Sequence, residues 1–599
     1  MSKYQGTTLE SLAKADLLAE QTNVLFTGRL SPPTTDVREL LDHCAEKGMG
    51  VLFWDRQITS MGPPDWRANV QRHPDKISAA VQQVVEIMKD YDRHPAAFGI
   101  FLADEGSSFS YTDYDRKIFR EKYGMEMPVP PATEQERARS PVLNPPKPTG
   151  EEEFRLRLNL ADYQSESLDL LFSAAAKELR QRFPKLVVTS LFTISSPGQY
   201  GVFMDRVFRP LDNLLVDIYP ASVHGVAQCQ AMYAMLRSAA ARAKKPWWLV
   251  AASWRNNPAG ARMQYWMALG SAMRGLGWYS TVDSLQSDVW EALIPYNQKL
   301  LEYGPLLARW EKPASKIAVL YADAEVARTD YSDHHRGLYQ VFSELYAHDL
   351  YADTVTEAQL RDGSVNEYET LVLPRNLQLE RDVVEKITDF ARRKPVYPGP
   401  ETLVAIPGAK PFDAAEIRKR IRPDFTSPDA NVYVEPLISG DLHYAIAYNR
   451  NPVPIEETIT ARDFVPVAVY DLWTGERFPV KGCSATVKLA PYEGRMLAWL
   501  PFDPAKLVVE VKGKPSPGNA VTVAVSQSAQ GNRRGLLPLS VDVFAPDGSR
   551  VAGYSFKAVM VDGRLSFPIQ FVKNDPAGKW RIVVTDLVTR RTVEALVPR

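Results

Sequence analysis

Two neighbouring acids, Asp104 and Glu105, come directly after a short apolar run at residues 96–103 and just before Gly106. Apolar runs of this length, bounded by turn residues, are typical of buried parallel strands. Acidic side chains just beyond the carboxyl end of such a strand lie where barrel enzymes keep their catalytic groups. The alternative is that one of these acids caps the helix that follows. We favour the catalytic role, because the surrounding sequence is organised like a β/α barrel.

Three further acids lie at or near the carboxyl ends of other expected strands, namely Asp55, Asp217 and Asp283. Several carboxyl groups at one end of a barrel suit glycoside hydrolysis, which needs one group as proton donor and another as nucleophile or base. Each acid taken alone has a structural alternative, as a helix cap or as the partner of an arginine. The pattern predicts Glu105, Asp217 and Asp104 as catalytic residues, and Asp55 and Asp283 as contacts to the substrate.

Aromatic residues are concentrated in the first half of the chain, where nine of the twelve tryptophans precede residue 311. Aromatic rings at the mouth of a barrel can stack on the C–H faces of sugars, while acids and amides bind the hydroxyl groups. The alternative is that these large apolar rings belong to the core of the barrel. The aromatic residues predicted to contact the substrate are Trp54, Tyr219, Trp254, Trp278 and Tyr279.

The sequence predicts no metal and no organic cofactor. Cys44, Cys229 and Cys483 are far apart and show neither a metal-ligand spacing nor a disulfide framework. His334 and His335 stand at the start of an expected helix, and no ligand spacing joins them to the barrel acids, so we expect an exposed surface pair. No glycine-rich dinucleotide fingerprint follows the first strand of the second α/β region.

The elements that must position these residues are alternating strands and helices, which continue to about residue 311 and predict βα units around a parallel sheet. A proline-rich stretch at 127–150, either a lid or a surface loop, interrupts the pattern before a long helix at 151–183. A closed barrel needs eight strands, and we identify seven. Because a helix comes first, we expect the absent strand to be the first, compressed into the opening residues or missing from the chain. The seven expected strands are residues 23–28, 50–55, 96–103, 186–193, 213–219, 246–253 and 275–281.

The pattern changes near residues 312 and 430, where a second alternating region begins and then gives way to strands alone. The predicted fold class is α/β, with a TIM-type (β/α)8 barrel, a doubly wound α/β domain and two β-sandwich domains. The second sandwich, with turn signals at residues 546–548 and 575–576, is predicted to be immunoglobulin-like. The expected domain limits are 1–311 for the barrel, 312–428 for the Rossmann-like α/β domain, 429–503 for the first sandwich and 504–599 for the second.

The composition argues against several classes of partner. With a net charge of −1 and a pI near 6.8, nothing points to nucleic acid or to a membrane surface. No apolar run is long enough to cross a bilayer, and the opening residues lack the continuous apolar core of a signal peptide. We expect a cytoplasmic protein if the chain is complete, and an exported one if an N-terminal segment has been removed.

The order of these parts resembles the family 42 glycoside hydrolases, the clan A β-galactosidases and their relatives, over roughly residues 7–500. The resemblance rests on FLADEG at 101–106, FREKYG at 119–124, VDIYP at 216–220, MQYWMALGSAMRGLGWYS at 263–280, and KIAVLYAD with YETLVLP at 316–323 and 368–374. It implies a barrel followed by a trimerisation domain and a β-sandwich, a carbohydrate substrate, and a homotrimer assembled through residues 316–425. It also implies that Glu105 is the acid/base of a glycosidase.

Two departures from the family pattern affect this interpretation. The family's Asn before the acid/base is Asp104 here, and a second carboxylate discourages ionisation of Glu105, which suits a proton donor. The family's nucleophile is a Glu that closes the strand at 246–253, where this chain has Ala251, Ala252 and Ser253.

Three interpretations remain. Asp217 or Asp283 works opposite Glu105, or the enzyme inverts through a more distant carboxylate. The third is a non-catalytic carbohydrate-binding protein derived from a glycosidase barrel. We rank a hydrolase acting on a β-linked galactoside or related glycan above the binding protein.

Overall fold

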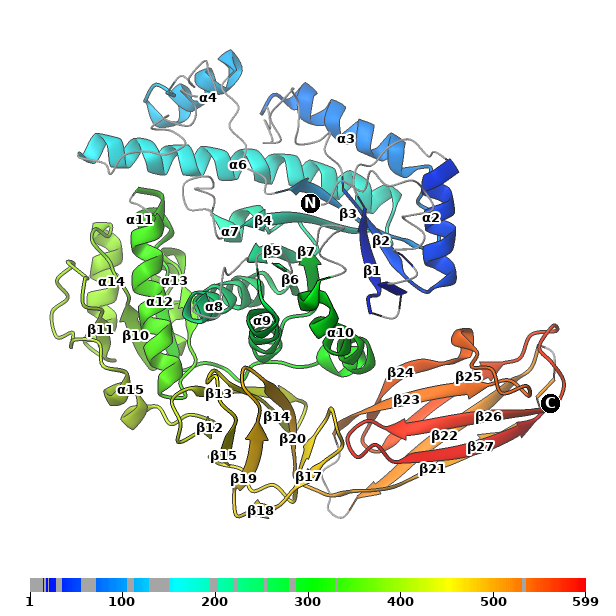
Figure 1. Cartoon of the computed structure of the whole chain (residues 1–599). Helices are drawn as coiled ribbons and strands as arrows, with labels where there is room; N and C mark the ends of the chain where they lie inside the picture. Colours follow the sequence, from blue (N-terminus) through cyan, green and yellow to red (C-terminus); the bar gives the residue numbers. More distant parts are fainter. Residues whose placement is uncertain are drawn as a thin grey trace.

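The structure is a computed structural model of the 599-residue chain (Figure 1). It describes residues 15, 18–19, 21–27, 35–54, 72–104, 112–128, 150–193, 203–218, 225–252, 256–279, 287–328, 331–513, 515–516, 518–529 and 535–599.

Seven parallel strands form one curled sheet in the order of the chain, each hydrogen-bonded to the next. With its covering helices this sheet is a TIM-type barrel, as predicted. Among the described residues β1 and β7 are the edges of the sheet, so the eighth strand of a closed barrel would lie between them. The strands are β1 (Val24–Thr27), β2 (Gly50–Trp54), β3 (Ala97–Asp104), β4 (Val187–Thr193), β5 (Leu214–Ile218), β6 (Trp247–Ala252) and β7 (Gly275–Tyr279). The helices are α2 (Thr35–Glu46), α3 (Pro74–Met88), α4 (Asp113–Tyr123), α6 (Glu151–Arg182), α7 (Met204–Val207), α8 (Val226–Ala243), α9 (Pro258–Gly270) and α10 (Asp288–Leu307).

The central barrel strands, β2 to β6, bury both of their faces, which explains why their sequences are nearly continuous apolar runs. Alternate side chains point into the lumen, and the others pack against the helices. On β5, for example, Leu215 faces the lumen, while Val216 and Ile218 belong to the core beneath the helices. The buried lumen cluster consists of Leu52, Phe101, Leu191, Leu215 and Val250.

Strand β3 carries an irregularity directly before the acids that the sequence singles out. Phe101 pairs with Thr189 of β4, but Asp104 pairs with Leu191, so β3 has one residue more than β4 over this stretch. Such bulges bend a strand and change the direction of the side chains that follow. Simple alternation along the sequence therefore does not decide which of the two acids faces the lumen.

A parallel sheet of four strands follows the barrel, in the order β11-β10-β8-β9. Helices α11 and α12 pack against the barrel helices α6 and α8, respectively. The predicted doubly wound α/β domain is thereby confirmed, with β9 as a strand that is too short to recognise in the sequence. Its strands are β8 (Ile317–Leu320), β9 (Asp353–Val355), β10 (Thr370–Leu373) and β11 (Val396–Pro398). Its helices are α11 (Asp323–Arg328), α12 (Tyr331–Ala347), α13 (Glu357–Asp362), α14 (Arg381–Ala391) and α15 (Ala414–Arg420).

Glu325, on α11, lies where the strand order of this sheet reverses, between the ends of β8 and β10. Its carboxylate is buried and accepts hydrogen bonds from Asn376 Nδ2 at 2.6 Å, from Gln378 N at 3.2 Å and from Leu377 N. The side chain therefore holds the connection after β10 against the first helix of the domain.

The prediction that His334 and His335 form an exposed pair is wrong. Both side chains are buried at the start of α12, with ring centroids 5.4 and 5.7 Å from that of Tyr321. The reason is that α12 packs against both the barrel helix α8 and the end of β8, so its first turn is covered. Burial lowers the pKa of His334 to about 4.

The remaining strands form antiparallel sheets, as the predicted β-sandwich domains require. Two sheets, ordered β12-β15-β19-β18 and β13-β14-β20-β16-β17, face each other across a shared core that includes Val434, Val487 and Trp499. The last seven strands form one sheet, β21-β22-β25-β24-β23-β26-β27, whose outer strands β21 and β27 approach each other and whose strands β23 and β24 contact α10 (Figure 1). The strands are β12 (Phe425–Thr426), β13 (Val432–Ser439), β14 (Leu442–Asn449), β15 (Ile455–Ala461), β16 (Ala468–Asp471), β17 (Arg477–Phe478), β18 (Val480–Lys481), β19 (Ser484–Leu489), β20 (Gly494–Leu500), β21 (Pro504–Lys512), β22 (Ala520–Ala529), β23 (Leu536–Phe544), β24 (Phe556–Val561), β25 (Arg564–Gln570), β26 (Lys579–Asp586) and β27 (Thr592–Pro598).

A buried ion pair joins the first three parts of the molecule. Lys312, just after the barrel, pairs with Glu435 of β13, and its ammonium lies 4.8 Å from the centre of the Tyr351 ring. Arg237 of α8 pairs nearby with Asp353 of β9 at 2.9 Å. Burial lowers the pKa of Lys312 to about 8, against the opposing effect of Glu435. The expected domain limits stay predictions, because contacts such as the Glu311–Ile438 bridge cross them. None of the helices in the described ranges has the length and apolar character needed to cross a membrane.

Glu325 makes the stability of the protein depend on pH. Burial raises the pKa of Glu325 from 4.5 to about 7, against the hydrogen bonds that it accepts from Leu377 and Asn376. As the pH rises, the unfolded chain loses this proton before the folded protein does, so the stabilisation present below pH 4.5 is lost by about pH 7. We expect the difference in unfolding free energy between the native protein and Glu325→Gln to fall by about 3 kcal/mol across this range. Urea unfolding of both proteins at each pH measures it, and a constant difference would contradict the assignment.

Gly99 of β3 predicts a second effect on stability. A methyl group at this position would collide with the carbonyl oxygen of Val187 and lie 2.9 Å from Val187 Cβ and 3.0 Å from Leu52 Cδ1. We expect Gly99→Ala to lower the unfolding free energy by about 2 kcal/mol, because β3 cannot move away from both neighbouring strands. The control is Gly553→Ala, where a methyl group meets nothing within 4 Å. Equal losses for the two variants in urea unfolding would refute the close approach of the strands.

Candidate functional site

The structure describes part of the predicted site. Trp54 and Asp104 are the last residues of β2 and β3, and Tyr279 is the last residue of β7, but their side chains are not among those described. The other predicted site residues that lie outside the described ranges are Asp55, Glu105, Tyr219, Trp254 and Asp283. All of these stay predictions.

Asp217 is the predicted catalytic acid whose placement the structure describes. It pairs with Thr193 of β4 and Val250 of β6, one residue before the end of β5. Because Val250 and Leu215 both face the lumen, alternation along β5 directs Asp217 to the same side. The side chain is fully buried. A carboxyl group therefore lies inside the barrel, directly beyond the apolar lumen cluster and close to the carboxyl ends of the strands.

The register relates Asp217 to the acids after β3. Asp104 pairs with Leu191 of β4, and Leu191 pairs with Leu215 of β5, two residues before Asp217. Two spacings of about 4.8 Å separate β3 from β5, so backbone positions on these strands are about 10 Å apart. Side chains of this pair of strands can thus act on opposite sides of a sugar that binds between them.

Strand β6 brings no acid to the same edge. It ends at Ala252, and no Asp or Glu occurs in residues 247–257. Val250 faces the lumen, whereas Ala251 belongs to the core beneath the helices. The strand on which the family resemblance places a nucleophile has only small or apolar side chains at its end.

Trp278, predicted to contact the substrate, has the contacts of a packed residue. Its indole lies against Ala261, Val289 and Leu293, from α9 and α10. Its Nε1 donates a hydrogen bond to Asn297 Oδ1 at 3.0 Å. Its pairing with Ala251, which also faces the helices, agrees with this direction. These contacts favour a structural role, and a role in sugar binding stays a prediction.

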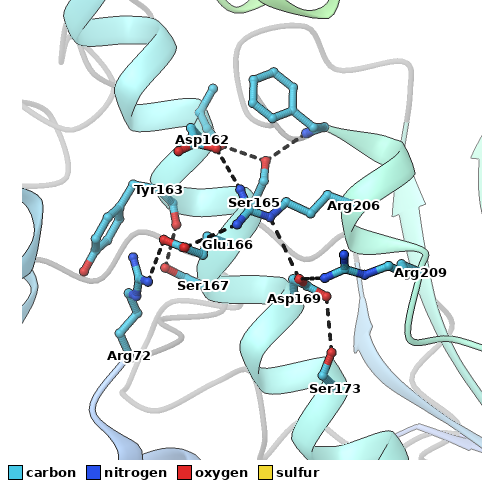
Figure 2. Close-up of polar contacts among 12 residues, drawn as sticks. Arg72, Asp162, Tyr163, Ser165, Glu166, Ser167, Asp169, Ser173, Arg206 and Arg209 are labelled. Carbon is cyan, nitrogen blue, oxygen red and sulfur yellow. Dashed lines mark hydrogen bonds and ion pairs between the residues drawn. The ribbon is translucent and has the colours of Figure 1, made fainter. Parts of the chain in front are cut away.

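A cluster of charged side chains on α6 was missed in the sequence (Figure 2). Three acids spaced by four and three residues, Asp162, Glu166 and Asp169, share one side of the helix, a spacing that brings side chains together. The sequence signal was present, but the cationic partners come from distant segments. We call the set Arg72, Lys122, Asp162, Glu166, Asp169, Arg206 and Arg209 the α6 ion-pair cluster.

The contacts in this cluster are close. Asp162 accepts hydrogen bonds from Lys122 at 2.9 Å, from Tyr123 at 2.6 Å and from Arg206 at 2.7 Å. Although burial works in the opposite direction, the hydrogen bonds from Tyr123 and Lys122 hold the pKa of Asp162 below its ordinary value. Lys122 and Arg72 do the same for the pKa of Glu166, again against burial. Both carboxylates are thus kept charged at neutral pH.

The cluster lies level with the barrel mouth. Strand β4 has seven residues, so it rises about 23 Å, which α6 covers in about 15 residues. Because α6 ends at Arg182, shortly before β4 starts at Val187, the helix residues near 167 are level with the carboxyl end of β4. The α6 ion-pair cluster therefore stands beside the edge at which the predicted catalytic acids are expected.

No group of three or more His, Cys, Asp or Glu side chains in the described ranges could hold a metal ion. Cys44 and Cys229 are buried, and their burial raises the pKa of each thiol, to about 11 and about 12. Neither thiol is available as a thiolate at neutral pH.

Comparison with known proteins shows the fold. No family model matches the chain, and no curated protein matches its sequence. The chain is similar in structure to a β-galactosidase from Bacillus circulans, with 14% identity and a TM-score of 0.63 over 83% of this chain and 97% of that one. A catalytic mutant of a GH42 β-galactosidase from G. stearothermophilus gives 13% identity and a TM-score of 0.63, covering 82% and 95% of the two chains. A GH42 exo-carrageenase from Bacteroides ovatus gives 12% identity and a TM-score of 0.55, and the match covers 80% of each chain.

These identities are low, so the likeness concerns the arrangement of the chain and not its residues. The shared parts include the barrel, since at least four fifths of this chain is covered in each case. The chain therefore has a glycosidase-like fold, similar to that of the GH42 β-galactosidases.

Proposed function

We propose that the protein is a glycoside hydrolase that acts on a β-linked galactoside or a related glycan. The observation that carries the proposal is the buried, lumen-facing Asp217, two strands away from the strand that ends in Asp104. A pair of carboxyl groups across a barrel mouth is what glycoside hydrolysis requires. The likeness of the fold to GH42 β-galactosidases supports the substrate class.

In the proposed mechanism Glu105 protonates the glycosidic oxygen as the bond to the leaving group breaks. Asp217 takes a proton from the water that attacks the anomeric carbon from the other face. Asp104, next to Glu105, disfavours a second negative charge and so helps Glu105 to keep its proton. This inverting scheme requires carboxyl groups about 6.5–9.5 Å apart, which leaves room for the attacking water, whereas retention requires them about 5 Å apart.

The remaining predicted residues would bind the sugar. Aromatic rings stack on apolar sugar faces, and carboxylates accept hydrogen bonds from hydroxyl groups. We assign the first task to Trp54, Tyr219, Trp254 and Tyr279, and the second to Asp55 and Asp283.

A second candidate is a non-catalytic carbohydrate-binding protein. The absence of Asp and Glu from residues 247–257, at the end of β6, favours it, because retaining hydrolases of the resembling family place their nucleophile there. Binding of a glycan without turnover of any member of a broad glycoside panel would establish this function instead.

Substitution of the two acids tests the proposed roles. We expect Glu105→Gln to remove most activity on glycosides with poor leaving groups, and to affect activated aryl glycosides much less, because their leaving groups need little protonation. Asp217→Asn should damage turnover of both kinds of substrate by about a hundredfold or more, because the attack itself loses its base. Initial rates on matched alkyl and aryl glycosides measure both effects.

Thermal unfolding of each variant serves as the control, because Asp217 is fully buried and its substitution can also weaken the fold. Equal losses on the two substrates for Glu105→Gln would show that Glu105 is not the proton donor. A product of retained anomeric configuration, seen by NMR at early times, would overturn the inverting scheme.

The protein is also predicted to form a homotrimer through residues 316–425. Leu403 of this region is a large apolar side chain with 75% of its surface exposed, which suits a contact with another chain. We expect light scattering to find particles of three 67.2 kDa chains, and Leu403→Glu to shift them toward single chains. Val453→Glu, at an exposed apolar residue of the first sandwich, is the control and should leave the assembly unchanged. A single-chain mass for the native protein at micromolar concentration would refute this prediction.

A further inference from the structure

We infer that the α6 ion-pair cluster is a positioning device that couples the three connections leaving β2, β3 and β4. These connections carry Asp55 and Glu105. The kinetic consequence of the inference rests on the proposed function, whereas its structural consequence does not.

Each connection is fixed to α6 at the point where the structure describes it again. After β2 the first such residue is Arg72, whose guanidinium lies 4.5 Å from the centre of the Tyr163 ring. After β3 the chain enters α4, where Asp115 accepts a hydrogen bond from the Tyr163 hydroxyl at 2.8 Å. After β4 the backbone N–H of Phe203 donates to Ser165 Oγ at 2.8 Å. Three segments that leave neighbouring strands thus end on one stretch of a single helix.

Glu166 contacts all three of these connections. Its carboxylate pairs with Arg72 at 2.6 Å and with Arg206 of α7 at 3.3 Å, both drawn in Figure 2. It also pairs with Lys122 of α4 at 3.0 Å. These cations come, in that order, from the connections after β2, β3 and β4. One carboxylate therefore forms an ion pair with one cation from each connection.

Loss of this carboxylate would affect the three segments together. Without it the cations of Arg72, Lys122 and Arg206 face one another with less negative charge between them, and like charges at this distance repel. Arg72 is the most buried of the three, with 10% of its side chain exposed, so water screens its charge least. If an ion pair served only local stability, its loss would disturb only the segment that carries it.

The chain offers a matched control for the experiment. Glu302 of α10 is 21% exposed, compared with 22% for Glu166, and it pairs with two cations, Lys299 and Arg590, where Glu166 pairs with three. It joins α10 to the chain after β26 and stands in no contact with the α6 ion-pair cluster. Glu166→Gln and Glu302→Gln therefore remove comparable ion pairs at different places.

The test measures hydrogen exchange of the full-length variants over residues 72–88, 112–123 and 203–212. We expect Glu166→Gln to increase exchange in all three segments at once, Glu166→Asp to restore protection in part, and Glu302→Gln to leave the three unchanged. If Glu166→Gln does not fold, Lys122→Met replaces it, and should increase exchange in 72–88 and 203–212 although the residue belongs to α4. Increased exchange confined to one segment would overturn the inference.

The kinetic arm compares kcat and KM of the same variants on an aryl glycoside. We expect Glu166→Gln to lower kcat about tenfold or more with little change in KM, and Glu302→Gln to leave both nearly unchanged, because only the first misplaces the mouth of the barrel. Equal kcat losses for the two variants would contradict the inference. If the native protein turns over no glycoside, the proposed function fails, and the exchange measurement still decides whether the connections are coupled.

Discussion

The burial of both faces of the central barrel strands, β2 to β6, is the constraint on which the rest of this structure depends. It places apolar side chains both in the lumen and under the helices, while catalytic groups of barrel enzymes lie in the layer at the carboxyl ends of the strands. Asp217 occupies that layer, next above Leu215 on its strand. A carboxyl group there lies against the apolar lumen cluster, which keeps water away from one side of it. Its interactions with any charge that develops beside it are therefore stronger.

Helices on the outer surface of the barrel pack against the first sandwich domain. Trp266 and Tyr296 of α9 and α10 pack against Trp473 of the first sandwich, with ring centroids 4.9 Å from that of Trp473. Glu493 accepts hydrogen bonds from both of these barrel residues. Trp310 likewise packs against Tyr444 of β14. Trp266 and Trp310, two of the tryptophans that enrich the first half of the chain, therefore belong to contacts between domains, and the prediction of a sugar site depends on the others.

The fold could be predicted from the sequence because buried parallel strands and amphipathic helices leave strong local patterns, and long elements such as α6 were placed to within a residue or two. Features that depend on distant partners could not. The extra residue in β3 shows only in its pairing with β4, and His334 is buried beside Tyr321 and Arg375, which follow two different strands. The acids of α6 were visible at helical spacing, but their meaning comes from Arg72 and Arg206, which lie on either side of α6 in the sequence. Of the predicted catalytic residues, only Asp217 can be placed with its side chain, and the roles of the others stay predictions.

Glu325 has a consequence for what the α/β domain can do. In doubly wound sheets, the crevice at the carboxyl ends of the strands, where the strand order reverses, is the usual place for a bound ligand. Here a carboxyl group of the chain itself accepts hydrogen bonds from the backbone N–H groups of Leu377 and Gln378, which lie at this place. Glu325 thus satisfies, from within the domain, two donors of the kind that a bound anion uses elsewhere.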